Sequence, residues 1–144
     1  MLPRKIFSRN LTMVLATPRI LLSDDDAAFR LVLTESLHRR GYEVTATGDG
    51  GEAIEVWDNG RGRFDLCLVD FHMPRATGID VIRHVRSTPQ TSTTCLLMSA
   101  EMTDAIRDQA IAADAYRVLT KPLRIKLLAE VLADALRDRR GLAN

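Results

Sequence analysis

The chain has 144 residues, of which 46% are hydrophobic and 27% charged, and its length and composition are typical of one globular domain. No hydrophobic run exceeds four residues, which excludes a segment that spans a membrane. The two cysteines, Cys67 and Cys95, lie in apolar runs without the spacing of a metal site, so we expect reduced core thiols. These features are typical of an intracellular protein, and we expect it in the cytoplasm.

Basic and acidic side chains are almost balanced, 20 Lys and Arg against 19 Asp and Glu, but they are unevenly distributed. Residues 1–23 hold four basic side chains and no acidic one, so the remaining 121 residues hold 16 and 19, a formal charge of −3. Because these 121 residues have no excess of basic side chains, we do not expect them to bind nucleic acid directly. We interpret residues 1–17 as a basic tail outside the fold, residues 18–140 as the domain, and residues 141–144 as a C-terminal tail.

Short apolar runs alternate with helical patterns from residue 19 onward. Five runs predict strands, at residues 20–22, 42–46, 66–69, 95–98 and 116–119. Apolar residues at helical spacing follow each run, and after the first run they are Phe29, Val32, Leu33 and Leu37. This i, i+3, i+4, i+8 spacing predicts a helix with one buried face. The repeated alternation predicts an α/β fold, a parallel sheet with helices on both faces.

Polar residues stand directly after four of the predicted strands, and they are Asp24–Asp26, Asp70, Ser99 and Lys121. In an open parallel sheet, ligands bind beyond the carboxyl ends of the strands. Clustered carboxylates suit Mg²⁺, a lysine offers a positive charge to an anion, and a serine offers a hydroxyl donor. The set predicts a phosphoryl-transfer site with Asp70 as the nucleophile.

At these positions the sequence resembles the receiver domain of two-component response regulators. The matching stretches are 20–26, 65–70, 73–78, 99–100 and 121–122, and the resemblance covers about residues 18–138. It implies a flavodoxin-like (βα)5 fold with strand order 2-1-3-4-5. It also implies a stand-alone receiver of the chemotaxis type, because fewer than ten residues follow the last predicted helix.

The resemblance assigns a role to each polar residue. Asp70 would be the phosphoacceptor, and Ser99 and Lys121 would contact the phosphoryl oxygens. The ligands of Mg²⁺ would be Asp24, Asp25, Asp70 and the backbone carbonyl of His72. The donor would be a phosphohistidine on a histidine kinase or a phosphotransfer protein. We assign Asp26 to the start of the following helix, where a carboxylate favours the helix dipole.

Two positions depart from the family pattern. Ser23 replaces the usual aliphatic residue before the acidic pair, and Val118 stands where receivers usually carry an aromatic residue. The nearest aromatic residue, Tyr116, is expected on the same strand face as Val118, because side chains alternate with period two. It lies too far along the strand to occupy the same pocket. We therefore expect the switch to act through the loop after the fourth strand and the fourth helix.

The expected partner surface is the face formed by the fourth helix, the fifth strand and the fifth helix. Its basic rim would include Arg107, Arg117, Arg124 and Lys126. We expect output through a contact with a downstream protein or through a phosphorelay, with a homodimer through the same face as a further expectation.

The leading interpretation is a signalling receiver rather than an enzyme, with self-catalysed phosphorylation and dephosphorylation only. An alternative is a phosphorylation-independent interaction module with a vestigial site. A third interpretation is an aspartyl-phosphate hydrolase. Such enzymes have a D-x-D pattern at the nucleophile, whereas here His72 occupies the second position after Asp70.

Overall fold

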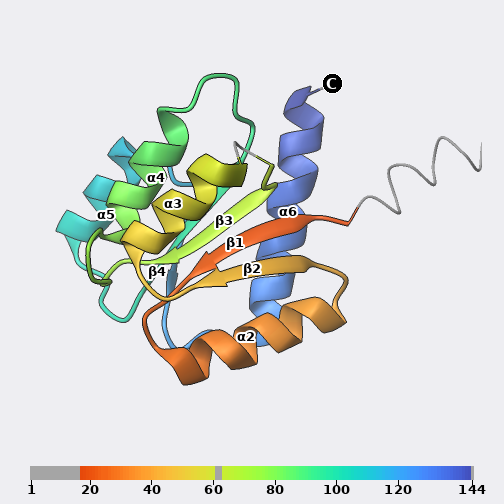
Figure 1. The fold of residues 1–144 in the computed structure, drawn as a ribbon, viewed down its shortest axis with the longest axis horizontal. Coiled ribbons are helices and arrows are strands. Elements are labelled where there is room, and N and C mark those ends of the chain that lie inside the picture. Colours follow the sequence, from red (N-terminus) through yellow and green to blue (C-terminus); the bar gives the residue numbers. More distant parts are fainter. Residues whose placement is uncertain (1–16, 61–62, 144) are drawn as a thin grey trace, which may run out of the picture.

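The computed structural model describes residues 17–60 and 63–143, which form one five-stranded parallel sheet covered by helices (Figure 1). The strands are β1 (Arg19–Ser23), β2 (Glu43–Thr47), β3 (Leu66–Asp70), β4 (Thr94–Ser99) and β5 (Arg117–Thr120). Their order is β2-β1-β3-β4-β5, and every neighbouring pair is parallel. The predicted flavodoxin-like topology is confirmed.

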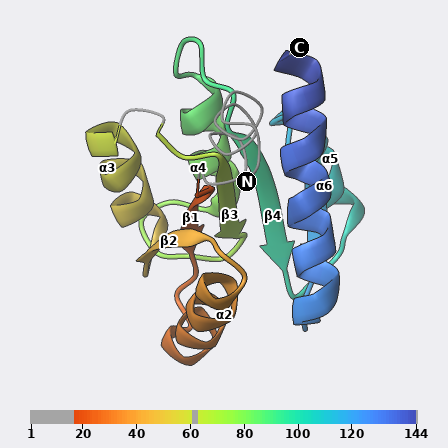
Figure 2. The ribbon, with the colours of Figure 1, turned by 90° about the vertical axis from the view of Figure 1, so that its right-hand side faces the viewer.

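Helices cover both faces of the sheet, as Figures 1 and 2 show. They are α2 (Ala27–Arg39), α3 (Gly50–Gly60), α4 (Gly78–Arg86), α5 (Asp104–Ala112) and α6 (Ile125–Ala143). α2 and α6 lie on one face, and α3, α4 and α5 lie on the other. α6 includes residues 141–143, so the predicted C-terminal tail is wrong for these residues. Residues 1–16 of the predicted basic tail lie outside the described residues. Within residues 17–60 and 63–143, no helix combines the length and the apolarity needed to cross a bilayer.

The sheet separates two hydrophobic cores. One core joins alternate residues of β1, β3 and β4 to α3, α4 and α5, and it includes Trp57, whose indole N–H donates to the hydroxyl of Thr88 at 2.8 Å. The other core joins the opposite residues of the same strands to α2 and α6. All five residues of β3 are buried, because this strand lies at the centre of the sheet with helices on both sides. The carboxyl end of β3 is thereby held rigidly, and Asp70 is its last residue.

The buried face of α2 is narrower than the sequence predicts. Leu33 and Leu37 are fully buried against the sheet, but Val32 is 56% exposed, so its predicted inward position is wrong. Val32 lies one residue before Leu33 and therefore about 100° around the helix from the buried stripe. The helix begins at the cap Asp26 and is followed by Gly41, whose φ of 93° suits a residue without a side chain.

Candidate functional site

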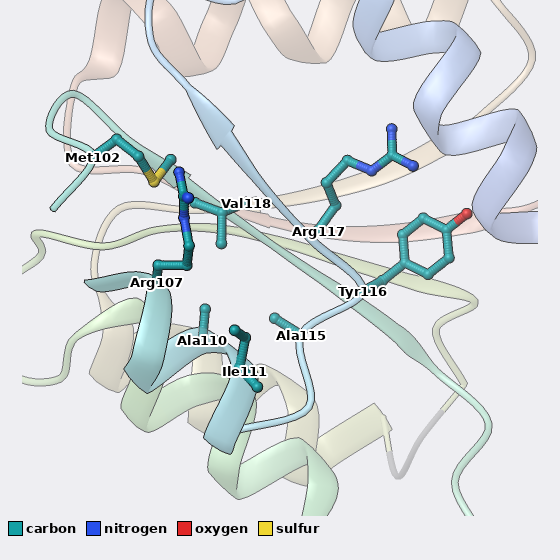
Figure 3. Close-up of a pocket in the computed structure, with 8 residues that line it drawn as sticks. All are labelled: Met102, Arg107, Ala110, Ile111, Ala115, Tyr116, Arg117 and Val118. Carbon is teal, nitrogen blue, oxygen red and sulfur yellow. The ribbon is translucent and has the colours of Figure 1, made fainter. Parts of the chain in front are cut away.

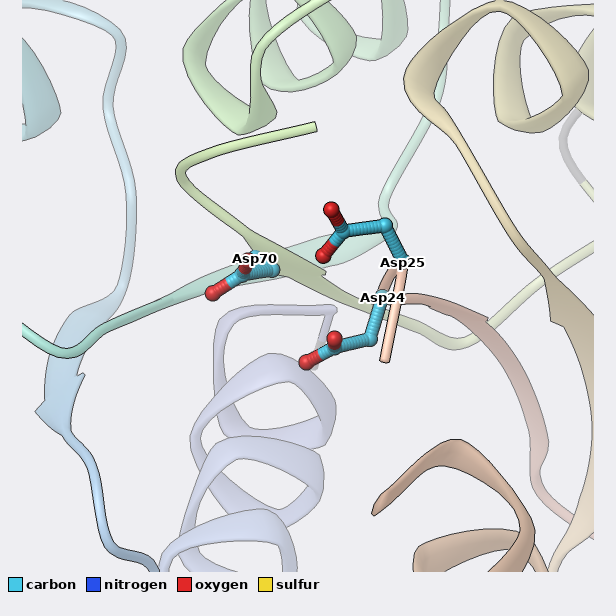
Figure 4. A group of neighbouring side chains, drawn as sticks. All are labelled: Asp24, Asp25 and Asp70. Carbon is cyan, nitrogen blue, oxygen red and sulfur yellow. The ribbon is translucent and has the colours of Figure 1, made fainter. Parts of the chain in front are cut away.

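Three carboxylates meet at the carboxyl edge of the sheet. Asp24 and Asp25 follow β1 directly, and Asp70 ends β3, the neighbour of β1. One carboxylate oxygen of each lies within 4.8 Å of the others, and Figure 4 shows the three side chains around a common space. Asp24 and Asp70 are buried and Asp25 is exposed, so this acidic cluster opens to solvent on one side. Oxygen ligands at such spacing are able to hold a hard divalent cation.

The ammonium group of Lys121 lies between the two buried carboxylates. Its Nζ is 2.7 Å from Oδ2 of Asp24 and 3.0 Å from Oδ1 of Asp70. The backbone N–H of Lys121 donates to the carbonyl of Ser99 at 2.8 Å, which fixes the lysine to the end of β4. Buried carboxylates are costly without a partner, and Lys121 supplies the partner for both. The three strand ends that carry these groups are therefore held together by charge as well as by the sheet.

The pKa values of Asp70 and Lys121 are both raised, but for different physical reasons. Burial and the neighbouring carboxylates Asp24 and Asp25 raise the pKa of Asp70, although Lys121 opposes the rise. Burial alone would lower the pKa of Lys121, but its hydrogen bonds and ion pairs with Asp24 and Asp70 outweigh burial and raise the pKa. Lys121 therefore stays cationic and keeps a fixed positive charge beside the Asp70 oxygen.

Asp26 is not one of the three carboxylates of the acidic cluster. Its carboxylate caps α2 and accepts a hydrogen bond from the backbone N–H of Phe29 at 3.1 Å. The backbone N–H of Asp26 in turn donates to Oδ1 of Asp24 at 2.9 Å. Of the three consecutive aspartates, the first two face Asp70 and the third begins the helix.

Ser99 and His72 have different environments at the rim of the cluster. Ser99 ends β4 and is fully buried, and its Oγ accepts a hydrogen bond from the backbone N–H of Glu101 at 3.2 Å. His72 is exposed, and its ring lies edge-on to the ring of Phe71, with centroids 4.7 Å apart. Ser99 is thus held in place by the loop that follows it, whereas the His72 ring faces solvent beside the phosphoacceptor candidate.

Two residues of α2 contact the site, and the sequence reasoning missed both. The Lys121 Nζ lies 4.8 Å from the centroid of the Phe29 ring. The guanidinium of Arg30 donates to the backbone carbonyl of Asp24 at 2.6 Å. The signal that could have found them is their place in the first turn of the helix that directly follows the acidic pair.

Ser23, which departs from the family pattern, connects the end of β1 to two loops. Its hydroxyl lies 3.1 Å from both the backbone carbonyl of Asp49 and the sulfur of Met73. Asp49 precedes α3 and Met73 lies in the loop between β3 and α4. The hydroxyl thus ties the end of β1 to the two loops beside the acidic cluster.

The loop between β3 and α4 is packed against two glycines. A Cβ atom on Gly50 would lie 2.0 Å from the carbonyl oxygen of Ala76, and one on Gly78 would lie 2.4 Å from the carbonyl oxygen of Asp70. Neither distance is possible without moving the backbone. Both glycines therefore allow the loop after Asp70 to approach its neighbours closely.

The structure corrects the expected relation between Tyr116 and Val118. Val118 packs against the core beneath α5, whereas Tyr116 packs against the core beneath α6. Figure 3 shows Val118 on the side of α5 and the Tyr116 ring turned toward α6. The expectation of a shared face is wrong because β5 begins only at Arg117, so the alternation of the strand does not extend to Tyr116.

A pocket of about 320 Å³ lies between α5 and β5 (Figure 3). Its residues are Met102, Arg107, Ala110, Ile111, Ala115, Tyr116, Arg117 and Val118. Small side chains leave the space open, Arg107 brings positive charge, and Ile111 is 69% exposed. The guanidinium of Arg117 instead lies over the ring of Tyr116, 5.6 Å from its centroid, on the side of α6 (Figure 3). Of the residues expected at the partner surface, Arg107 and Arg117 line this pocket, and Arg124 is exposed just before α6.

A family model decides what kind of domain this is. The model described as the response regulator receiver domain matches residues 20–133 of the chain. The chain belongs to this family. The match begins in β1 and ends in α6, so it includes the acidic cluster, Ser99 and Lys121. The resemblance drawn from the sequence is confirmed, and the chain contains a receiver domain of two-component signalling.

Solved receiver structures resemble this receiver in fold. The chemotaxis protein CheY4 of Vibrio cholerae is 30% identical and has a TM-score of 0.77, with 84% of this chain and 100% of CheY4 covered. A CheY-like receiver domain protein from Methanospirillum hungatei has a TM-score of 0.79 and is 21% identical, with 88% of this chain and 98% of that chain covered. The second likeness, at its lower identity, shows the fold alone.

Curated relatives of the receiver are longer proteins. The DNA-binding transcriptional regulator NtrC of Azospirillum brasilense is 35% identical over 117 residues, which cover 81% of this chain and 24% of NtrC. The transcriptional regulatory protein CpxR of Escherichia coli K12 is 33% identical over 119 residues, which cover 83% of this chain and 49% of CpxR. The chain therefore spans half or less of the length of these relatives.

Proposed function

We propose that this receiver accepts a phosphoryl group on Asp70 from a phosphohistidine of a histidine kinase or phosphotransfer protein. The observation that carries the proposal is the position of Lys121, with Nζ 3.0 Å from Oδ1 of Asp70 and 2.7 Å from Asp24. A cation held beside the nucleophilic oxygen is placed to neutralise charge on an incoming phosphoryl group. Asp25 leaves the same space open to solvent, which gives a donor protein access.

The chemistry needs only one bond to form and one to break. A carboxylate oxygen of Asp70 would attack phosphorus as the bond from phosphorus to the histidine nitrogen breaks, which yields an aspartyl phosphate and a free imidazole. Lys121 would neutralise one phosphoryl oxygen, and the Ser99 hydroxyl would donate a hydrogen bond to another. Loss of the phosphoryl group to water completes the cycle, so the activity is self-catalysed and not that of an enzyme with an external substrate.

The residues of the acidic cluster fit Mg²⁺. Three carboxylates with ligand atoms within 4.8 Å of one another form an all-oxygen donor set, the kind that Mg²⁺ prefers. Asp24, Asp25 and Asp70 would hold the ion, with the backbone carbonyl of His72 as a fourth protein ligand. When bound, Mg²⁺ supplies positive charge that offsets the charge of the transferring phosphoryl group.

The main competing function is a phosphorylation-independent interaction module with the same fold. Retention of the acidic pair, Asp70, Ser99 and Lys121 together favours phosphoryl transfer, because a binding module has no need to bury charged groups around one space. The test is intact mass after incubation with acetyl phosphate and Mg²⁺. We expect the gain of one phosphoryl group in the native chain and none in Asp70→Asn. An unmodified native chain that still binds its partner would favour the competing module.

We further propose that the output is a cytoplasmic contact between proteins through the surface of α5, β5 and α6. The supporting observation is the pocket whose rim carries Arg107 and Arg117. A partner with carboxylates around an apolar side chain complements this surface, and a second copy of the receiver or a phosphorelay protein is an equally testable partner. Charge reversal at Arg117 and Arg124 should weaken association at least tenfold and leave phosphorylation unchanged, and Arg83→Glu on α4 is the matched control. Equal association in all variants would place the interface elsewhere.

A further inference from the structure

The ring of Phe29 lies beside the ammonium group of Lys121, which also forms two ion pairs. Nζ of Lys121 lies 4.8 Å from the ring centroid, within the distance at which a cation is attracted to an aromatic face. The carboxylates of Asp24 and Asp70 contact the same nitrogen at 2.7 Å and 3.0 Å. Lys121 is thus held by two carboxylates and one ring.

Local structure fixes the ring in this position. Phe29 lies in the first turn of α2, and its backbone N–H donates to the capping carboxylate of Asp26 at 3.1 Å. Its side chain is half-buried and packs against the core beneath α2 and α6. Because α2 begins directly after the acidic pair, the same short segment of chain positions both the carboxylates and the ring around Lys121.

The ring acts where water has limited access. The Lys121 side chain is 21% exposed, and attraction between a cation and an aromatic face is stronger when the cation is partly desolvated. A lysine has a flexible four-carbon stem, so its ammonium group has many rotamers away from Asp70.

We propose that Phe29 is a positioning residue for phosphoryl transfer, and that the negative face of its ring holds the Lys121 ammonium group within reach of Asp70. This inference rests on the proposed function. The proposal assigns a role to the charge distribution of the ring and not only to its volume. Variants that change this charge distribution at nearly constant shape therefore test the proposal separately from core packing.

The decisive experiment replaces Phe29 with 4-fluoro-, 3,5-difluoro- and pentafluorophenylalanine in the full chain. Fluorination keeps the shape of the ring and weakens its negative face in steps. We expect the rate of phosphorylation by acetyl phosphate at saturating Mg²⁺ to fall in the same steps, by about three- to tenfold in total. Mg²⁺ affinity, measured by calorimetry, should change less than twofold, because the candidate ligands are carboxylates and the phenyl ring offers the metal no ligand atom.

Phe64 offers a matched control. Its ring also lies beneath a cation, with the guanidinium carbon of Arg19 5.3 Å from the centroid, but it is next to the start of β3, at the opposite end of the strand from Asp70. The same fluorinated series at Phe64 should leave the rate of phosphorylation unchanged. An equal loss at both positions would assign the effect to core packing and overturn the proposal.

Two natural substitutions give an independent test. Phe29→Leu keeps an apolar side chain without a ring and should lower the phosphorylation rate. Phe29→Tyr keeps the aromatic ring and should have the native rate. A native rate in the pentafluoro variant or in Phe29→Leu would overturn the positioning role while leaving the proposed function intact. A native chain that gains no phosphoryl group would instead refute the proposed function.

Discussion

The hydroxyl of Tyr116 donates a hydrogen bond to a carboxylate oxygen of Asp138, 2.5 Å away, and this bond joins the residue before β5 to α6. The bond holds the ring on the side of the sheet opposite to Val118. Movement of Tyr116 into the space beside Val118 would need the bond to break and the ring to cross the sheet edge. The tyrosine is therefore an anchor of α6 in this receiver.

The anchor predicts an unusual titration of Tyr116. The hydrogen bond to Asp138 raises the pKa of the phenol, so its contribution to stability is present below the ordinary value of 10.0 and is lost as the pH rises through the raised value. Asp138→Ala should bring the pKa of Tyr116 back toward the ordinary value. Phenolate absorbance measures this in a Tyr42→Phe background, which removes the other tyrosine, whose pKa is raised by burial. An unchanged titration curve would mean that the bond does not persist in solution.

A phosphoryl mimic should perturb the two ends of the β4–β5 region unequally. Ser99 ends β4 beside Lys121, and residues 99–110 include the loop and helix that follow it, whereas Tyr116 is bonded to α6. We expect beryllofluoride with Mg²⁺ to shift amide resonances of residues 99–110 strongly and that of Tyr116 slightly. A change in the rotamer of Tyr116 as large as that of Ser99 would contradict this expectation.

The acidic pair and the helix cap should separate by mutation. Asp25→Ala removes a carboxylate of the cluster and should abolish Mg²⁺-dependent phosphorylation. Asp26→Ala removes the cap of α2, which should cost about 1 kcal/mol of folding stability and leave most phosphorylation intact. The measurements are intact mass with acetyl phosphate and denaturant unfolding. Equal loss of phosphorylation in both variants would show that the assignment of the pair is incorrect.

His72 should affect the lifetime of the phosphoryl group and not its formation. Its exposed ring lies beside Phe71, two residues after Asp70, and we expect it to shape the path of an attacking water molecule. His72→Ala should change the dephosphorylation rate by more than about twofold, which corresponds to ~0.4 kcal/mol. Decay of the phosphorylated form after removal of acetyl phosphate gives this rate. A smaller change would leave the ring without a role at the site.

Removal of the Asp70 charge should stabilise the fold. Burial and the carboxylates of Asp24 and Asp25 raise the pKa of Asp70, so ionisation of this group destabilises the native state as the pH rises from the ordinary value of 3.8 through the raised value. Asp70→Asn should therefore raise the Tm by about 2–5 °C at pH 7. The gain should disappear in acid, where the native carboxyl group is protonated. A lower Tm at pH 7 would mean that the ion pair with Lys121 outweighs burial and repulsion.

The site was predictable wherever a polar residue ends a buried strand. Asp24, Asp70, Ser99 and Lys121 each follow an apolar run, and a parallel sheet brings the ends of such runs to one edge. The order of the strands came from the resemblance, since periodicity alone does not say which strands are neighbours. The contact between Lys121 and the two carboxylates then follows from the topology.

Side chains at the ends of elements were harder to predict. Tyr116 was placed by strand alternation, but the strand begins one residue later, and the bond to Asp138 on a distant helix decides where the ring lies. Val32 fits a helical spacing from Phe29, yet the sheet buries only the stripe through Leu33. The contact between Phe29 and Lys121 depends on residues far apart in the sequence, and no local pattern indicates it.

The two glycines beside the loop after β3 impose a constraint on any redesign of this receiver. Neither Gly50 nor Gly78 carries a side chain that could take part in chemistry, yet a methyl group at Gly78 would displace the carbonyl of Asp70 itself. In a scan of all substitutions, both positions would therefore score as intolerant as the phosphoacceptor, and activity data alone would class them with it. A folding assay would separate them, since crowding at either glycine should lower the Tm, whereas loss of the Asp70 charge should raise it. The same phenotype in an activity screen would then be traced to the backbone at the glycines and to the carboxylate at Asp70.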